Sequence, residues 1–399
     1  MLFSICYVLF VVSALFGGSI YVGPMTPRQY FTVLMALYCL KDVSYICSKF
    51  DKHIVLYVVF LLFMCVSFSF EGHFIDYLKI LISMHLVALV GYFSTLLLVK
   101  KNRNYNILAY TLLTLGGINA VVCLGQYLGV SSALALGLAF CDLNNESIFT
   151  NLNNMMEGES GAYLFGLLGH PVDNGYFMLV VTFLPLYFYN RKISGFWRTS
   201  IILTITFFLF ILLIIQQRSC FGLAVLLLML FVLRVVSFNK LISYFILLLP
   251  FLIVILSLVD WNTIFEGSRY MQDDVKEESR YSIYILSISY IFSHFLFGGY
   301  YSAIAYIGNA PHNIIFNAFV YSGLCGGIAI LALYYRQIKV SYINTRYDSP
   351  KLQSLSLALL AYSLNGLLHN NSLVTGDVMI WILWACIISN KGKKLLTDI

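Results

Sequence analysis

The chain is a succession of long apolar runs separated by short polar turns. Several runs carry no charged residue for about twenty positions, which is the length that an α-helix needs to cross roughly 30 Å of hydrocarbon. Lys41 and Asp42 interrupt the second run, so that helix is expected to end as early as Leu40. The pattern predicts about twelve transmembrane helices, near residues 2–22, 28–47, 53–70, 78–98, 106–130, 173–189, 199–216, 219–236, 241–260, 312–334, 353–369 and 373–389.

The composition is typical of a chain that uses lipid as its solvent. Of its 399 residues, 60% are hydrophobic and only 11% are charged, which is more apolar surface than one soluble core can bury. A β-barrel would show alternating segments of about ten residues instead. The segment from Leu2 to Tyr21 has neither a basic n-region nor a small-residue cleavage site before Pro24, so we interpret it as a retained helix. We expect an all-α, polytopic integral membrane protein, with residues 1–399 in a single membrane domain.

The basic residues predict the orientation of these helices. Positive side chains in short loops mark the cytoplasmic side of a membrane. Most of the 24 Lys and Arg residues fall in loops on one side of the twelve-helix arrangement, and most of the 18 acidic residues fall on the other side. Because the number of crossings is even, both termini are expected in the cytoplasm. The basic residues of this side are Lys41, Lys49, Lys52, Lys100, Lys101, Arg103, Arg191, Lys192, Arg198, Arg234, Lys240, Arg336, Lys339, Arg346, Lys351, Lys391, Lys393 and Lys394.

Two loops of the outer side are longer than connections need to be. They run from about 131 to 171 and from about 261 to 311, and loops beyond about 15 residues are usually functional or disordered. The second loop has an amphipathic stretch from Ser279 to Phe297, with apolar Ile283, Leu286, Tyr290 and Phe297 at near-helical spacing. We therefore predict helices in this loop that lie on the outer face of the membrane.

Three arginines on the outer side are candidates for binding an anion. Arg218 ends an apolar run at the membrane edge, whereas Arg269 and Arg280 lie in the second long loop. Guanidinium stays charged and presents a planar fork of donors that fits phosphate oxygens. Two alternatives stay open: Arg218 can be a snorkelling anchor, and the loop arginines can form a solvated face with the acidic residues between them.

His312 and Asn313 follow Pro311 where the second loop returns to the membrane. An imidazole can accept a proton from a sugar hydroxyl, and Asn313 can orient the imidazole or that hydroxyl. A histidine at a membrane interface is more often structural, so this alternative also stays open.

His170 and Asp173 close the first long loop, where Asp173 suits either a helix N-terminus or a contact with a sugar. Gly323, Gly326 and Gly327 lie one turn apart on the following apolar run, where close helix packing is the expected role. The sequence has no Walker loop, no metal-ligand spacing and no nucleophile elbow, so we expect no cofactor and no metal. The net charge of +6 is spread through short loops and gives no indication of nucleic-acid binding.

These residues occur in an order that resembles the O-antigen polymerase and O-antigen ligase superfamily. Arg218 at a membrane edge and Arg280 in a large loop precede His312-Asn313, which is followed after nine residues by Gly323 and Gly326. The segment 295–299, Phe-Leu-Phe-Gly-Gly, is similar to the Pro-Leu-Phe-Gly-x-Gly stretch of that superfamily, although Phe replaces the proline and the last glycine comes one place early. The resemblance at residue level extends from about 217 to 327.

The resemblance implies transfer of a glycan from undecaprenyl diphosphate to an acceptor hydroxyl at the periplasmic face of the bacterial inner membrane. Arg218 and Arg280 would bind the donor diphosphate, and His312 would activate the acceptor hydroxyl in an inverting displacement. The other residues assigned to substrate binding are Arg269, Asn313, His170 and Asp173. The implied partners are the lipid-linked oligosaccharide, the bilayer and a membrane protein that regulates chain length.

A polymerase and a ligase of this superfamily differ in the acceptor. A polymerase extends another lipid-linked repeat unit at its non-reducing end, whereas a ligase transfers the glycan to the lipid A core. The content of 29 Tyr and 32 Phe resembles that of polymerases and favours this assignment. A flippase or transporter of lipid-linked oligosaccharide is the alternative from another class, and it should show internal repeats and charged residues along the helices themselves.

Overall fold

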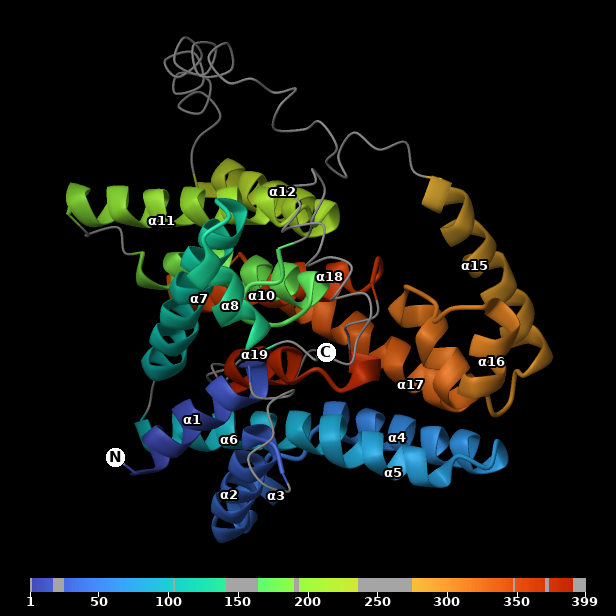
Figure 1. The fold of residues 1–399 in the computed structure, drawn as a ribbon. Coiled ribbons are helices and arrows are strands. Elements are labelled where there is room, and N and C mark those ends of the chain that lie inside the picture. The colour runs from blue at the N-terminus through green and yellow to red at the C-terminus, as the bar shows by residue number, and fades with distance from the viewer. Residues whose placement is uncertain are drawn as a thin grey trace. The chain divides into compact units, whose positions relative to one another are not determined.

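The structure is a computed structural model that describes residues 2–16, 25–102, 105–140, 164–189, 194–235, 275–346, 349–369 and 373–389, with the backbone alone for 234, 235 and 275–280. All regular elements in these ranges are helices, and the ranges contain no β-strand (Figure 1). The helices are α1 (Leu2–Phe16), α2 (Pro27–Lys41), α3 (Val43–Cys47), α4 (Lys52–Phe70), α5 (Phe74–Ile80), the π-helical η1 (Leu81–His85), α6 (Leu86–Asn102), α7 (Asn106–Tyr127), α8 (Ser131–Leu138), α10 (Pro171–Phe183), the 3₁₀ helix η2 (Leu184–Phe188), α11 (Gly195–Ile214), α12 (Arg218–Val235), α15 (Val275–Ser293), α16 (Tyr300–Ile307), α17 (Ile314–Asn344), α18 (Pro350–Asn365), the 3₁₀ helix η3 (Leu373–Thr375) and α19 (Val378–Ser389).

Five helical segments in the described ranges are long and apolar enough to cross a membrane. They are Lys52–Phe70, Phe74–Asn102, Asn106–Tyr127, Gly195–Ile214 and Ile314–Asn344. This confirms an all-α chain with membrane-spanning character. Shorter helices occupy other expected spans, and the predicted span 241–260 lies outside the described residues.

The chain forms two compact units, each of which is described by itself. Unit 1 contains Met1–Gly117, Phe183–Ile201 and Asp274–Ile399, and unit 2 contains Ile118–Thr182 and Ile202–Asp273. In unit 1, α17 packs along α4, and α19 packs along α6. Aromatic side chains pack between α19, α4 and α6. The ring centroid of Trp381 on α19 lies 4.5 Å from that of Tyr57 on α4 and 5.6 Å from that of Tyr92 on α6.

Polar contacts hold several helix ends of unit 1 together. Asp42, which separates α2 from α3, accepts a hydrogen bond from the Lys100 ammonium at 2.9 Å. Lys351 at the start of α18 donates to the side-chain oxygen of Asn106 at the start of α7, at 3.1 Å. The Tyr105 hydroxyl bonds to Ser389 at the end of α19. These contacts join segments that the sequence predicts on the cytoplasmic side. One group connects the α2–α3 junction with the end of α6, and the other connects the starts of α7 and α18 with the end of α19.

The amphipathic stretch of the second long loop is helical, as predicted, but it ends earlier than the sequence pattern indicates. Helix α15 ends at Ser293, and Tyr290 is buried in a small cluster with residues of α16 and α17. Phe297 was expected on the same helix. It lies instead in the following turn, where Gly298 and Gly299 have positive φ angles of 71° and 155° that only glycine adopts without strain.

This turn packs against a break in α17. Gly323 has φ 62° and ψ −160°, so the helix is interrupted there. In an unbroken helix the Leu324 N–H would bond to the Val320 carbonyl. Both groups turn instead to the preceding loop, because Leu324 N donates to Phe295 O at 2.8 Å and Gly299 N donates to Val320 O at 2.9 Å. Gly323 was expected to allow close helix packing. It also provides the positive φ angle at which α17 is interrupted.

Unit 2 contains the C-terminal part of α7, α8, most of α10 and α11, and α12. Gly137 of α8 lies against the segment that precedes α10, since a Cβ at this position would come within 2.6 Å of the Phe165 ring and 2.7 Å of the Gly166 carbonyl oxygen. The described ends of the first long loop, α8 and 164–170, are thus packed together.

We predict that Gly323→Ala destabilises the protein by on the order of 2 kcal/mol or more, because alanine is strained at positive φ and its Cβ would lie 2.2 Å from the Leu296 carbonyl oxygen. The apparent unfolding temperature of purified protein in detergent measures this effect. Gly117→Ala is the matched control, since a Cβ there meets nothing within 4 Å. Equal unfolding temperatures for the two variants would contradict the prediction.

Candidate functional site

His312 lies in the short segment between α16 and α17. It is half-buried and follows the buried Pro311. Asn313 is the N-cap of α17: its side-chain oxygen accepts from Ile315 N at 2.8 Å, and its side-chain nitrogen donates to Leu367 O at 2.9 Å. The amide therefore fixes the start of α17 against the end of α18 and so fixes the backbone next to His312.

Helix α15 brings the position of Arg280 to the neighbourhood of His312. The Tyr284 hydroxyl donates a long hydrogen bond of 3.5 Å to the His312 carbonyl oxygen, and the Tyr284 ring lies 5.4 Å from that of Phe316. Arg280 precedes Tyr284 by four residues on α15, so its backbone is on the same helix face one turn away. Unit 1 therefore pairs the elements that carry Arg280 and His312. Arg269 lies outside the described residues.

Arg218 begins α12 directly after a strained turn. Gln216 in this turn has φ 62°, and it is the one residue other than glycine with positive φ in the described part of the chain. The Nε and Nη2 atoms of Arg218 are buried. A snorkelling arginine would hold its guanidinium in water, and Arg218 as a whole is half-buried, so this alternative stays open. Strained turns of this kind cluster at functional sites.

His170 and Asp173 lie at the start of α10. The His170 side chain caps this helix, because its Nδ1 accepts from Val172 N at 3.3 Å. Nδ1 is therefore the unprotonated ring nitrogen. Asp173 is half-buried in the first turn of α10, where a negative charge is favourable near the helix N-terminus.

The start of α10 packs on the turn that carries Arg218. A Cβ on Gly175 would lie 2.6 Å from Gln217 Cγ, so the two elements approach as closely as a glycine permits. Unit 2 thus brings the elements of His170, Asp173 and Arg218 together. Arg280, His312 and Asn313 belong to unit 1, so the structure describes the candidate residues as two separate groups.

Sequence reasoning missed a buried amide network in unit 2. Asn119 donates to the Asn174 side-chain oxygen at 2.7 Å and accepts from Leu167 N at 2.8 Å, and Gln126 accepts from Gly166 N at 3.0 Å. These amides anchor the end of the first long loop to α7 and α10. Asn119 and Gln126 are seven residues apart in an apolar run, which places both on one helix face and is the signal that could have found them.

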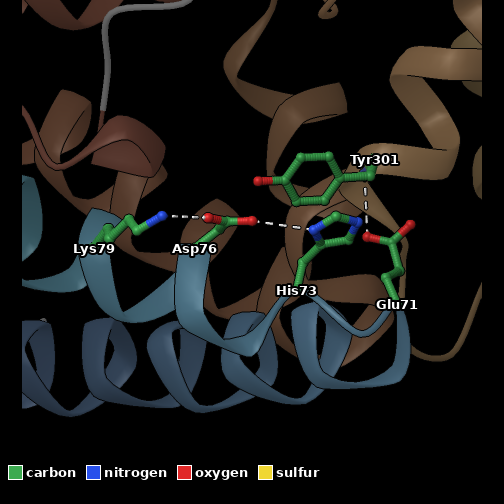
Figure 2. Close-up of polar contacts among 5 residues, drawn as sticks. All are labelled: Glu71, His73, Asp76, Lys79 and Tyr301. Atoms are coloured by element: carbon green, nitrogen blue, oxygen red, sulfur yellow. Dashed lines mark hydrogen bonds and ion pairs between the residues drawn. The ribbon is translucent and has the colours of Figure 1, made fainter.

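A second polar cluster that sequence reasoning missed joins the turn between α4 and α5 to the start of α16 (Figure 2). Glu71 Oε2 accepts from Tyr301 N at 3.1 Å. Its Oε1 accepts from Ser302 N at 2.8 Å and from the Ser302 hydroxyl at 2.6 Å. The carboxylate therefore caps the N-terminus of α16, although its residue lies 230 positions earlier in the chain.

His73 extends this cluster. Its Nδ1 lies 3.1 Å from Asp76 Oδ2, and Lys79 donates to Asp76 Oδ1 at 3.0 Å. The imidazole stacks on the Tyr301 ring with 3.8 Å between centroids. The sequence signal that could have found this cluster is the spacing Glu-x-His-x-x-Asp-x-x-Lys from Glu71 to Lys79, across the start of α5.

The described groups can bind an anion or exchange a proton, but they do not form a metal site. No three His, Cys, Asp or Glu side chains within the described ranges are arranged to hold a metal ion. Arg218 offers donors to an anion, and His312 and His73 offer imidazoles at helix ends. No protein-family model matches this chain, and no curated protein matches it.

Proposed function

We propose that this chain is an O-antigen polymerase, a glycosyltransferase of the bacterial inner membrane. It transfers a glycan from undecaprenyl diphosphate to the non-reducing end of another lipid-linked repeat unit. The transfer takes place at the periplasmic face, needs no metal and inverts the anomeric centre. In this proposal the chain crosses the membrane twelve times, both termini are cytoplasmic, and the two long loops are periplasmic.

The observation that carries the proposal is the pairing of α15 with the start of α17. The segments 280–284, 295–299 and 312–324 carry most of the sequence resemblance. They are joined by the contact between Tyr284 and His312 and by the two backbone hydrogen bonds at Gly323. Residues far apart in a sequence motif that meet in one place are what a single site requires.

The contacts between helix ends support the topology. Glu71 bonds to Ser302, so the end of α4 and the start of α16 lie at one end of unit 1. Two segments on one side of a membrane are separated by an even number of crossings, and the twelve-helix prediction has six between them. The ion pair of Asp42 with Lys100 likewise joins two segments that the proposal assigns to the cytoplasm.

Each candidate residue has a chemical task in this reaction. Departure of the lipid diphosphate concentrates negative charge on its oxygens, and guanidinium groups of Arg218 and Arg280 would stabilise that charge by bidentate hydrogen bonds. His312 would accept the proton of the acceptor hydroxyl as it attacks the anomeric carbon. Asn313, with its side chain engaged in capping α17, would contribute by holding His312 in place.

One observation favours a transporter as the second candidate. His85 is fully buried in η1, inside the apolar segment Phe74–Asn102, and its Nδ1 lies 2.6 Å from the Tyr57 hydroxyl. Ionisable residues and π-helical turns within a membrane span are often functional. Uptake of lipid-linked oligosaccharide into vesicles that His85→Ala abolishes, without any glycan transfer, would favour the transporter.

We predict that Arg218→Ala, Arg280→Ala and His312→Ala each lower glycan transfer by about a hundredfold or more, the size expected when transition-state charge stabilisation or a general base is lost. A deletion strain complemented with each variant is scored by polysaccharide gel, with membrane insertion measured by immunoblot. Arg198→Ala, at an exposed position on α11, is the control that keeps full activity. Full-length polysaccharide from the His312→Ala strain would refute the catalytic assignment.

The lipopolysaccharide of the deletion strain separates polymerase from ligase. We expect molecules that carry one core-linked repeat unit, because ligation continues when polymerisation is lost. Lipopolysaccharide without any repeat unit would show that the chain is the ligase.

We also predict that Gly175→Ala lowers transfer by about tenfold, because the added Cβ displaces Gln217 and with it Arg218, and small displacements of positioning groups carry penalties of this order. The control is Gly222→Ala on α12, where a Cβ meets nothing within 4 Å. Equal transfer rates for the two variants would contradict the prediction, because they would show that the packing of α10 on Gln217 does not position Arg218 for transfer.

A further inference from the structure

The cluster at the α4–α5 turn contains an imidazole held in a defined orientation with one nitrogen open. Asp76 is an acceptor when ionised, so the His73 Nδ1 that faces it at 3.1 Å carries the proton. In the neutral ring the other nitrogen, Nε2, is then a hydrogen-bond acceptor. In the described part of the chain Nε2 has no hydrogen-bond partner, and the His73 side chain is 41% exposed. The open position therefore suits a ligand that donates a hydrogen bond.

Tyr301 gives this imidazole a fixed neighbour. Its backbone N–H is held by Glu71, and its ring stacks on the His73 ring (Figure 2). Partial burial, and next the negative charge of Asp76, raise the pKa of the Tyr301 hydroxyl above its ordinary value. The hydroxyl therefore stays protonated, and it can donate to Asp76, the carboxylate that also orients His73.

Two exposed aromatic rings come from the segments that carry Glu71 and Tyr301. Phe70 directly precedes Glu71 and is 72% exposed, and its ring lies 4.9 Å from that of Phe297, which is 44% exposed. A few fixed polar groups beside apolar ring faces are the usual composition of a small-molecule site. Sugars present hydroxyl donors at their edges and apolar C–H groups on their faces, so they match both parts of this cluster.

A second histidine of the chain shows what is particular about His73. His294 stacks on Tyr290 with 4.1 Å between ring centroids, close to the 3.8 Å of His73 and Tyr301. The Nδ1 of His294, however, contacts the Ser293 hydroxyl and the Tyr290 carbonyl oxygen. No carboxylate in the described part of the chain pairs with it. His294 is thus a natural control for the stack without the acid.

We propose that His73, Asp76 and Tyr301 form a saccharide-binding subsite that holds a hydroxyl-bearing sugar of the lipid-linked substrate. This inference rests on the proposed function and deepens it, because it adds a contact with the glycan to the groups assigned to the diphosphate and the proton. His73 Nε2 accepts a sugar hydroxyl, Asp76 fixes the tautomer that makes this possible, and Phe70 and Phe297 line the sugar face.

The test measures the initial rate of transfer by the full chain in lipid nanodiscs, with the lipid-linked repeat unit purified from the deletion strain as the probe. Asp76→Asn keeps the shape of the cluster, but its amide can donate to Nδ1 and so favours the tautomer in which Nε2 carries the proton. We expect Asp76→Asn and His73→Ala to raise the half-saturating concentration about tenfold, as one lost hydrogen bond does. The maximal rate is expected to stay within about twofold, and His294→Ala is expected to behave as the unaltered protein.

Three outcomes would overturn the inference. Unchanged half-saturating concentrations in Asp76→Asn and His73→Ala, with His312→Ala still inactive, would refute the subsite and leave the proposed function standing. Parallel losses of maximal rate and unfolding temperature would mean that the cluster only supports the fold. If the unaltered protein transfers no glycan, the proposed function fails and the subsite fails with it.

Discussion

A peptide group in hydrocarbon has no water to bond with, so every break in a helix there must be repaired by another part of the protein. The break in α17 at Gly323 is repaired by the turn between α15 and α16, through main-chain bonds to Phe295 and Gly299. These bonds tie the described part of the second long loop to a membrane-type helix. The end of α15 and the start of α16 are held by these bonds, and the segment that carries His312 follows α16.

The same logic explains why the helices were easier to predict than the departures from them. Helix α4 was expected at 53–70 and spans Lys52–Phe70, and α2 ends at Lys41, where charged residues interrupt the apolar run. The length of the apolar run and the charged residues that end it determine the bounds of such helices. Helix α17 continues to Asn344, ten residues past the expected end, because a helix that has left the hydrocarbon needs no apolar sequence to continue.

The candidate residues were predictable one at a time, whereas their contacts were not. Arg218 and His312 stand out because they are polar groups at the ends of apolar runs. The bond of Glu71 to Tyr301 joins residues 230 positions apart, and no local pattern indicates that pairing. The buried nitrogens of Arg218 and the positive φ of Gln216 flank Gln217, which packs against Gly175 of α10, and a single sequence does not determine that packing.

The distribution of charge along the helices bears on what kind of chemistry the chain performs. In the five long apolar segments, charged side chains lie toward the ends: Lys52, Asp76, Lys79, Lys100, Lys101, Arg198, Arg336 and Lys339. A pathway through the membrane needs polar groups along the helix interiors. His85 is the described titratable group that meets this condition most clearly, and its neighbour Tyr57 already bonds to it. Arg218, His170 and His312 instead lie at helix ends, and Arg218 follows the strained turn at Gln216. Charge arranged in this way suits the proposed reaction, which takes place at the membrane surface, better than it suits passage of a polar substrate through the membrane.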